Sequence, residues 1–147
     1  MWFEGMGMLP VDRDDSKAAI ASLDTALEVL GRGEAFGIYP EGTRSRDGRL
    51  YRGRTGVAHL ALMAGVPVVP VGLKGTRDVQ PVDASMPKLA PVSVAFGAPI
   101  SPSAYADLPL GKARRLLTDE IMAAIAGAER PGRGRDLQRA GCRRVSR

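Results

Sequence analysis

The chain has 147 residues, a length that suits one domain able to bury about two-thirds of its unfolded surface. Its composition, 44% hydrophobic and 25% charged, is that of an ordinary globular protein. No apolar run approaches the ~20 residues that span a bilayer. We expect no signal peptide, and the single Cys142 excludes an internal disulfide and a cysteine-based metal cluster.

The net charge of +5 is unevenly distributed along the chain. Residues 130–147 carry seven arginines and one acid, a net +6, which leaves residues 1–129 at −1. This division predicts a folded domain over 1–129 and a disordered, arginine-rich tail over 130–147. The tail is interpreted either as a solubilising segment or as a contact to nucleic acid or anionic lipid. No aromatic residue lies among its arginines, so we expect no nucleic-acid partner.

The first predicted helix begins at one of the capping residues Asp14, Asp15 or Ser16, and Gly31 and Gly33 end it. One apolar face recurs at helical spacing and is expected to pack against a sheet: Ile20, Leu23, Leu27 and Leu30. Upstream, residues 1–10 are apolar and rich in glycine, which is unusual at the free start of a domain. We therefore expect the chain to begin inside a larger fold.

A buried strand is predicted over 35–39, followed by a loop over 40–52 in which Asp47-Gly48 indicates a turn. The loop and the residues just after it are strongly basic through Arg44, Arg46, Arg49, Arg52 and Arg54. This surface is interpreted either as solvated or as a site that attracts anionic lipid headgroups. A helix is predicted over 54–64, with Val57, Leu60, Ala61 and Ala64 on one face and Gly65 at its end.

The second half of the chain continues the alternation of strands and helices. Residues 66–73 predict an edge or irregular strand, because Pro67 and Pro70 cannot donate to a ladder. A connection over 75–91, a strand over 92–96 and a loop with a helical turn over 101–109 follow. The last helix is expected over 112–128, with an inward face made of Leu116, Leu117, Ile121 and Ile125. The alternation predicts an α/β domain.

An acid, a glycine, a hydroxyl and a guanidinium lie side by side within Ile38–Ser45, at the end of the strand predicted over 35–39. Ligands of α/β sheets tend to bind outside the carboxyl ends of strands. Arg44 offers a planar fork of donors that fits a phosphate or a carboxylate. Gly42 allows close approach to the backbone. An ordinary turn with Pro40 at its second position explains the same residues without a ligand.

The sequence Tyr-Pro-Glu-Gly-Thr-Arg-Ser at residues 39–45 closely resembles the Phe-Pro-Glu-Gly-Thr-Arg-Ser block of the glycerolipid acyltransferases, the lysophosphatidic acid (1-acylglycerol-3-phosphate) acyltransferases. Tyr39 keeps an aromatic ring in place of the usual Phe. Gly7–Arg13 looks like the upstream block that carries a binding arginine. Ala64–Val71 with Gly75-Thr76 looks like the downstream block, where a helix leads into a strand rich in Val and Pro. The resemblance covers residues 1–100 well and the rest loosely.

This resemblance implies a layered α/β domain of the glycerol-phosphate acyltransferase type, with a mixed, largely buried sheet flanked by helices and incomplete at its N-terminus. It implies transfer of a fatty acyl group from acyl-CoA or acyl carrier protein to the hydroxyl of 1-acylglycerol-3-phosphate, with no metal and no bound cofactor. The residues expected to bind the acceptor are Arg13, Glu41, Gly42, Thr43 and Arg44. A peripheral position at the cytoplasmic face of an anionic membrane is also implied.

The family's catalytic His-x4-Asp pair lies upstream of its binding arginine, and this chain contains no such pair. His59 is the single histidine, the residue five positions later is Ala64, and both follow the Glu-Gly-Thr-Arg block. We interpret His59 as an ordinary helix residue and assign no catalytic residue. The sequence therefore predicts the C-terminal portion of an acyltransferase domain that is inactive alone. The alternative is a non-catalytic relative that binds anionic lipid.

Overall fold

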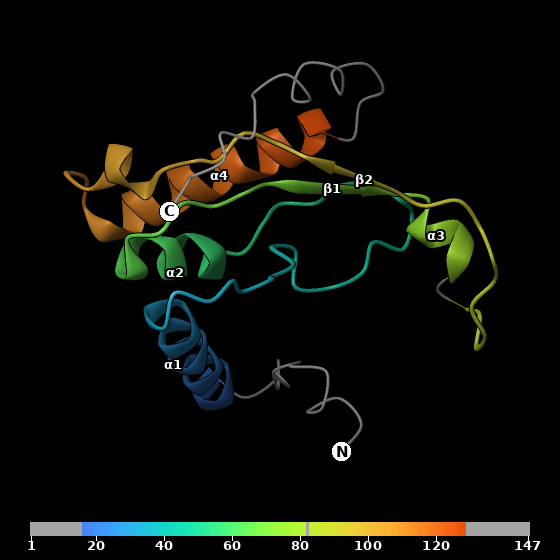
Figure 1. Ribbon diagram of the computed structural model, residues 1–147, viewed down its shortest axis with the longest axis horizontal. Coiled ribbons are helices and arrows are strands. Elements are labelled where there is room, and N and C mark those ends of the chain that lie inside the picture. Colours follow the sequence, from blue (N-terminus) through green and yellow to red (C-terminus); the bar gives the residue numbers. More distant parts are fainter. Residues whose placement is uncertain (1–15, 82, 129–147) are drawn as a thin grey trace, which may run out of the picture.

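The computed structural model describes residues 16–81 and 83–128, with residues 16–20 described by their helical backbone alone. The predicted acceptor-binding residue Arg13 and the predicted disordered tail over 130–147 lie outside these residues. The elements in order are α1 (Ser16–Gly31), α2 (Gly56–Ala64), β1 (Val71–Lys74), α3 (Thr76–Val79), β2 (Ser93–Phe96), the 3₁₀ helix η2 (Pro102–Tyr105) and α4 (Leu110–Ala128). Figure 1 shows α4 along one side of the strands, α2 below it, and α3 at the far end of the strands.

The core lies between α2 and α4, the two helices that supply its buried apolar side chains. Val57, Ala58 and Ala61 of α2 pack against Leu117, Ile121, Met122 and Ile125 of α4. Val68, Ile100 and Tyr105 close the edges of this cluster. The apolar periodicity of the sequence therefore identified both core helices correctly.

The ends of the predicted helices are confirmed, with small shifts. α2 ends at Gly65, whose φ of 66° is a left-handed conformation that glycine adopts without a steric penalty. α1 ends at Gly31, as predicted, and its main contact is with α2, whereas packing against a sheet was expected. The predicted inward face of α4 was wrong at Leu116, which is 41% exposed. At 3.6 residues per turn, Leu116 points away from the buried stripe that contains Ala113, Leu117 and Ile121.

β1 and β2 form an antiparallel pair in which Val71 lies opposite Phe96 and Leu73 opposite Val94. An isolated pair, Val68 and Ile100, exchanges two further backbone hydrogen bonds of 2.9 and 2.8 Å. Pro70 interrupts the ladder between them because proline has no backbone N–H to donate. The prediction of an irregular strand over 66–73 is thus confirmed.

The α/β class is confirmed, although the described strands are more exposed than a largely buried sheet would be. The buried Gly72 lies on the face that α4 covers, since α4 contacts β1. Strand side chains alternate between faces, so Val71, Val94 and Phe96 lie on the opposite face, and all three are exposed.

The strand predicted over 35–39 was wrong, because these residues have no regular structure. Ile38 and Tyr39 are exposed, and no described residue forms a ladder with this segment. An extended segment becomes a strand only when a neighbouring strand accepts and donates its backbone hydrogen bonds. The apolar composition of this segment therefore did not indicate a paired strand.

Candidate functional site

A tight turn at Tyr39–Gly42 starts the segment that carries the candidate site. The backbone N–H of Gly42 donates to the carbonyl of Tyr39 at 3.0 Å, with Pro40 at the second turn position as predicted. Gly42 has a φ of +70°, a conformation that favours glycine. A Cβ at Gly42 would lie 3.1 Å from Cδ and Nε of Arg54, so the Arg54 side chain passes directly over the turn.

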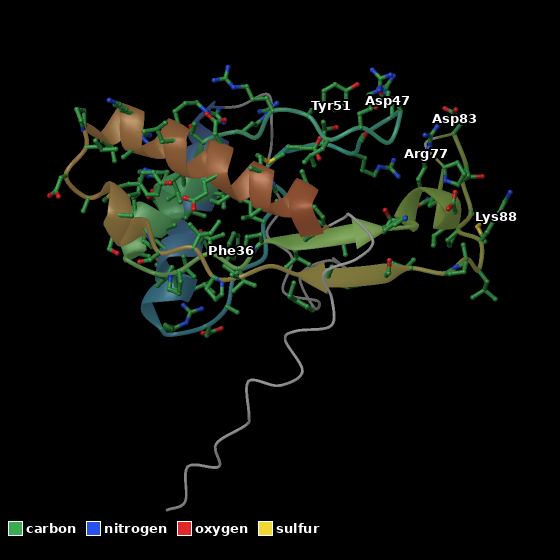
Figure 2. All side chains as sticks on the ribbon, turned by 90° about the horizontal axis from the view of Figure 1, so that it is seen from above. Phe36, Asp47, Tyr51, Arg77, Asp83 and Lys88 are labelled. Carbon is green, nitrogen blue, oxygen red and sulfur yellow. The ribbon has the colours of Figure 1, made fainter. Side chains whose placement is uncertain are left out.

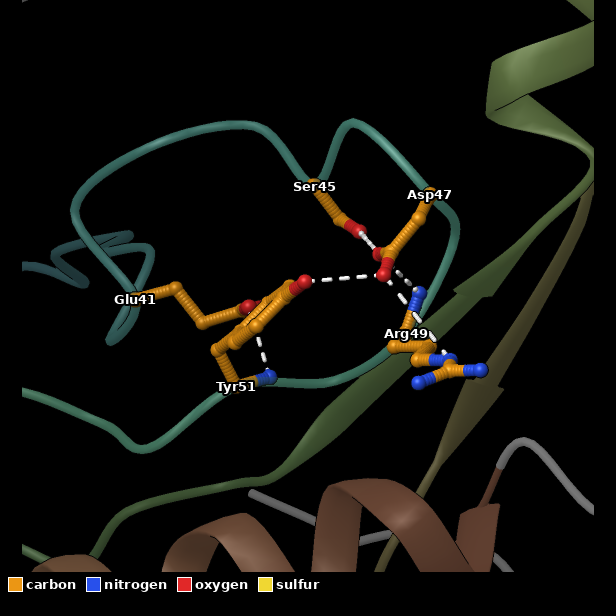
Figure 3. A network of polar contacts seen from close by, with 5 residues as sticks. All are labelled: Glu41, Ser45, Asp47, Arg49 and Tyr51. Carbon is orange, nitrogen blue, oxygen red and sulfur yellow. Dashed lines mark hydrogen bonds and ion pairs between the residues drawn. The ribbon is translucent and has the colours of Figure 1, made fainter.

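Two hydrogen bonds close the base of the loop over residues 40–54, which we call the arginine loop. The Arg54 N–H donates to the Pro40 carbonyl at 2.7 Å. The Tyr51 N–H donates to Oε2 of Glu41 at 2.9 Å, so the Glu41 carboxylate reaches across the loop to the segment that leads back to α2 (Figure 3). These bonds close the base of the loop, whose tip remains exposed to solvent.

Asp47 organises the tip of the arginine loop by accepting three hydrogen bonds (Figure 3). The donors are the Ser45 hydroxyl at 3.1 Å, the Arg49 N–H at 3.0 Å and the Tyr51 hydroxyl at 2.8 Å. The bond from the Arg49 N–H contributes most to lowering the pKa of Asp47 below its usual value. The bond to Asp47 also raises the pKa of the Tyr51 hydroxyl.

The carboxylates of the loop are thus occupied by the loop's own donors, whereas its arginines are exposed. Arg49 lies 3.8 Å from Asp47 in a weak, exposed ion pair. Within the described part of the chain, the guanidinium groups of Arg44 and Arg46 form no hydrogen bond or ion pair. The arrangement therefore leaves Arg44 available to an anionic ligand.

A further arginine approaches the loop tip from α3. A Cβ at Gly48 would lie 3.2 Å from Nη1 of Arg77, so Arg77 contacts the turn beside Asp47. Figure 2 shows Asp47, Tyr51 and Arg77 at the same end of the molecule. The sequence did not indicate this contact, because Arg77 lies 29 positions after Gly48 and belongs to no recognised block.

The base of the arginine loop is attached to α4 at Gly53, which is buried. A Cβ at Gly53 would lie 2.9 Å from Met122 and from Thr118, so only glycine fits between the loop and the helix. Arg115 of α4 donates from Nη1 to the Gly53 carbonyl at 3.0 Å. Its Nε donates to Asp119 at 3.0 Å, and its Nη2 also pairs with Asp119. These contacts fix the loop relative to the core.

Of the predicted acceptor-binding residues, Glu41, Gly42, Thr43 and Arg44 lie together at the start of the arginine loop. Thr43 and Arg44 are exposed, while Glu41 is half-buried and bonded to Tyr51. Arg13 lies outside the described residues, so its proximity to Arg44 stays a prediction. His59 lies on α2 with a buried Nδ1 that has no hydrogen-bond partner among the described residues.

Known proteins resemble the chain over the region that contains these residues. The sequence model of the Acyltransferase family matches residues 2–74. The chain is 40% identical over 76 residues to a chloroplastic 1-acyl-sn-glycerol-3-phosphate acyltransferase of Brassica napus, covering 52% of this chain and 22% of that protein. It is 36% identical over 109 residues to a 1-acyl-sn-glycerol-3-phosphate acyltransferase of Limnanthes douglasii, covering 63% of this chain and 39% of that protein.

The fold also matches a solved structure. The crystal structure of the 1-acyl-sn-glycerophosphate acyltransferase PlsC from Thermotoga maritima superposes with a TM-score of 0.62 and 29% sequence identity, covering 76% of this chain and 44% of that one. The chain thus spans between about a fifth and somewhat under half of the length of these relatives. From the matching family model, the similar curated sequences and the shared fold, we conclude that the chain belongs to the glycerolipid acyltransferase family.

Proposed function

We propose that the chain carries the acceptor-phosphate side of an acyltransferase site of phospholipid synthesis. The acceptor is 1-acylglycerol-3-phosphate, and the donor is acyl-CoA or acyl carrier protein. The observation that carries this proposal is the closed arginine loop, in which Glu41 and Asp47 bind the loop's own donors while Arg44 has no partner among the described residues. An exposed guanidinium without a protein partner can donate two parallel hydrogen bonds to a phosphate.

The proposed reaction joins the acceptor hydroxyl oxygen to the carbonyl carbon of the acyl thioester. The carbon–sulfur bond breaks, and the hydroxyl proton ends on the leaving thiol. A positioned base that takes this proton typically contributes ~10²–10⁴ to the rate. No aspartate follows the single His59 at the family's spacing, since residue 64 is alanine. We therefore propose that this polypeptide binds the acceptor but does not catalyse acyl transfer by itself.

Binding of glycerol 3-phosphate tests the acceptor role without requiring turnover. Purified 147-residue protein should bind glycerol 3-phosphate in a calorimetric titration, and Arg44→Gln should weaken binding at least about tenfold, since a charge-assisted bond contributes roughly 1.5–3 kcal/mol. Arg32→Gln is the matched control, because Arg32 is exposed and pairs with Glu34 at the end of α1. No binding by the wild type, or equal loss in both variants, would contradict the acceptor role.

The inactivity of this polypeptide is tested separately in an acyl-transfer assay. Lysophosphatidate and radiolabelled acyl-CoA should give no product above the uncatalysed background. Turnover by the purified chain that Arg44→Ala abolishes would show that a base is present after all.

We also propose a peripheral contact between the arginine loop and an anionic membrane surface, at its cytoplasmic face. The exposed Tyr39 and Tyr51 have the amphipathic rings that favour the headgroup region, and they lie among the loop arginines. Each arginine near an anionic surface contributes about 1 kcal/mol. None of the described helices is long and apolar enough to cross a bilayer.

Flotation with vesicles tests the membrane contact. The protein should float with phosphatidylcholine vesicles that contain phosphatidylglycerol and remain unbound with pure phosphatidylcholine. A variant with Arg44, Arg46 and Arg49 replaced by Glu should not float. Equal flotation of the wild type and this variant would exclude the loop as the contact.

A non-catalytic relative that binds anionic lipid remains the second candidate, favoured by the missing His-x4-Asp pair. Translation of the genomic DNA upstream of Met1 distinguishes the two. An in-frame His-x4-Asp would support the acyltransferase, and a start signal at Met1 without that motif would support the binding protein.

A further inference from the structure

Arg115 lies on α4, far along the chain from the family blocks, yet it bonds directly to the loop that carries Arg44. We propose that Arg115, oriented by Asp119, is a positioning residue for the acceptor-phosphate site. The inference rests on the proposed function, because it assigns Arg115 the task of holding the arginine loop in its binding conformation.

The guanidinium of Arg115 is held in one orientation by its hydrogen-bond partners. Its Nε and Nη2 both pair with the Asp119 carboxylate one helical turn away, and this two-point contact sets the plane of the guanidinium. Nη1 then donates to the Gly53 carbonyl at 3.0 Å. The bond to Gly53 is partly buried, whereas the bonds to Asp119 are exposed.

The bond to Gly53 acts on Arg44 through the base of the loop. Gly53 precedes Arg54, whose N–H donates to the Pro40 carbonyl at 2.7 Å. Pro40 in turn precedes Glu41, which accepts the Tyr51 N–H. Arg115 therefore holds the last residues of the loop, and those residues hold the segment on which Arg44 lies.

The packing at Gly53 explains why a hydrogen bond is needed there. Thr118 and Met122 leave no room for a Cβ at Gly53, so the loop cannot move closer to α4. The residue contributes no side chain to the core, so apolar packing does not prevent the loop from moving away. The hydrogen bond from Arg115 to Gly53 opposes this outward movement. Without it, the loop would have to become ordered when the acceptor binds, and the entropy lost in that ordering would weaken binding.

The test compares Arg115→Gln, Arg115→Lys and Arg114→Gln in the full chain. Arg114→Gln is the matched control, because it removes the same charge from the neighbouring position and the Arg114 side chain bonds to no described residue of the loop. Glycerol 3-phosphate binding should weaken about tenfold in Arg115→Gln, the equivalent of roughly one hydrogen bond, and remain within about twofold in Arg114→Gln. Arg115→Lys should weaken binding by an intermediate amount, because one ammonium cannot reproduce the three hydrogen bonds that the planar guanidinium donates.

Amide hydrogen exchange separates positioning from a general loss of structure. In Arg115→Gln, the N–H groups of Arg54 and Tyr51 should exchange faster, while those of Leu117 and Ile121 in the core should exchange as in the wild type. Affinity and loop exchange in Arg115→Gln that match those of Arg114→Gln would overturn the proposal. So would a loss of affinity with unchanged loop exchange.

A second variant covers the case in which Arg115→Gln does not fold. Asp119→Asn keeps Arg115 but removes the charge that orients it, and should give a smaller loss of affinity with faster exchange at Arg54. Wild-type exchange at Arg54 in this variant would overturn the proposal. Absence of glycerol 3-phosphate binding by the wild type would instead contradict the proposed function.

Discussion

The Oε2 atom of Glu41 accepts a hydrogen bond of 2.9 Å from the backbone N–H of Tyr51, ten residues further along the chain. The acid of the Glu-Gly-Thr-Arg block thus binds its own loop. Glu41 was predicted to bind the acceptor, and this bond gives it a further role within the loop. In the structure it shapes the loop, and the exposed Thr43 and Arg44 are the residues of the block that remain available to a ligand.

Substitution of Glu41 should therefore weaken acceptor binding indirectly. Glu41→Gln keeps an oxygen that can accept the Tyr51 N–H, and should lose only the charge-assisted part of the bond, roughly 0.5–1.5 kcal/mol. Glu41→Ala should cost more because the Tyr51 N–H loses its acceptor. Calorimetric titration with glycerol 3-phosphate measures both, and Glu34→Gln, which is exposed and outside the loop, is the control. Equal affinities for Glu41→Ala and Glu34→Gln would contradict a role for the bond between Glu41 and Tyr51 in acceptor binding.

The turn at Gly42 should not accept a side chain. Gly42→Ala places a Cβ at a φ of +70° and 3.1 Å from the Arg54 side chain, so we expect a loss of about 1–2 kcal/mol in the free energy of unfolding. Gly37→Ala is the control, because nothing lies within 4 Å of the added Cβ and its φ is not positive. Urea unfolding compares the two variants. Similar midpoints would show that the turn relaxes without strain.

The loop tip should be stable over a defined range of pH. The folded-state pKa of Asp47 is lowered, so its contribution is present above the ordinary value of about 3.9 and is lost as the pH falls through the lower folded value. The folded-state pKa of Tyr51 is raised, so its contribution is present below about 10 and is lost as the pH rises. Both residues are exposed, so we expect local opening and no global unfolding.

The amide proton of Arg49 reports this titration directly in NMR spectra, since it donates to Asp47. Its chemical shift should titrate with a midpoint below about 3.9 in the wild type and show no such transition in Asp47→Asn. A midpoint at or above the ordinary value of an aspartate would contradict the three-donor arrangement.

Two adjacent leucines of α4 should differ sharply in their effect on stability. Leu117 is fully buried between α2 and α4, whereas Leu116 is 41% exposed. Leu117→Ala should lower the free energy of unfolding by about 2–5 kcal/mol through lost burial and a cavity, and Leu116→Ala by roughly 1 kcal/mol or less. Urea denaturation of the two variants measures both losses in the free energy of unfolding. Equal losses would mean that the core does not lie where the structure places it.

The helices were predictable because their signals are local. The apolar spacing and terminal glycines of α1 and α2 lie within one or two turns of the residues they govern, and both predictions were confirmed. The strand predicted over 35–39 failed because a strand depends on a partner that local sequence does not specify. Leu116 failed for a related reason, since it lies about 100° from Leu117 around α4 and the sequence does not show how far the buried face of the helix extends.

Some features of the candidate site were likewise predictable from the sequence, and others were not. The block from Glu41 to Arg44 was found from its resemblance to a family, and the turn at Pro40 from turn chemistry. The contact between Arg115 and Gly53 joins residues 62 positions apart and has no sequence signature. The spacing of Arg115 and Asp119 indicates a helical ion pair, but only the packing of α4 beside the loop shows that this pair supports the site.

The pair of strands β1 and β2 has a consequence for the behaviour of the protein at high concentration. Its outward face, which includes Val71, Val94 and Phe96, is apolar and carries no charged side chain. The net positive charge that makes copies of the chain repel one another comes almost entirely from residues 130–147. Because salt screens charge over about 8–10 Å but does not weaken apolar association, added salt should promote self-association through this face. Crystallisation and storage conditions would then depend more on a few strand residues than on the isoelectric point.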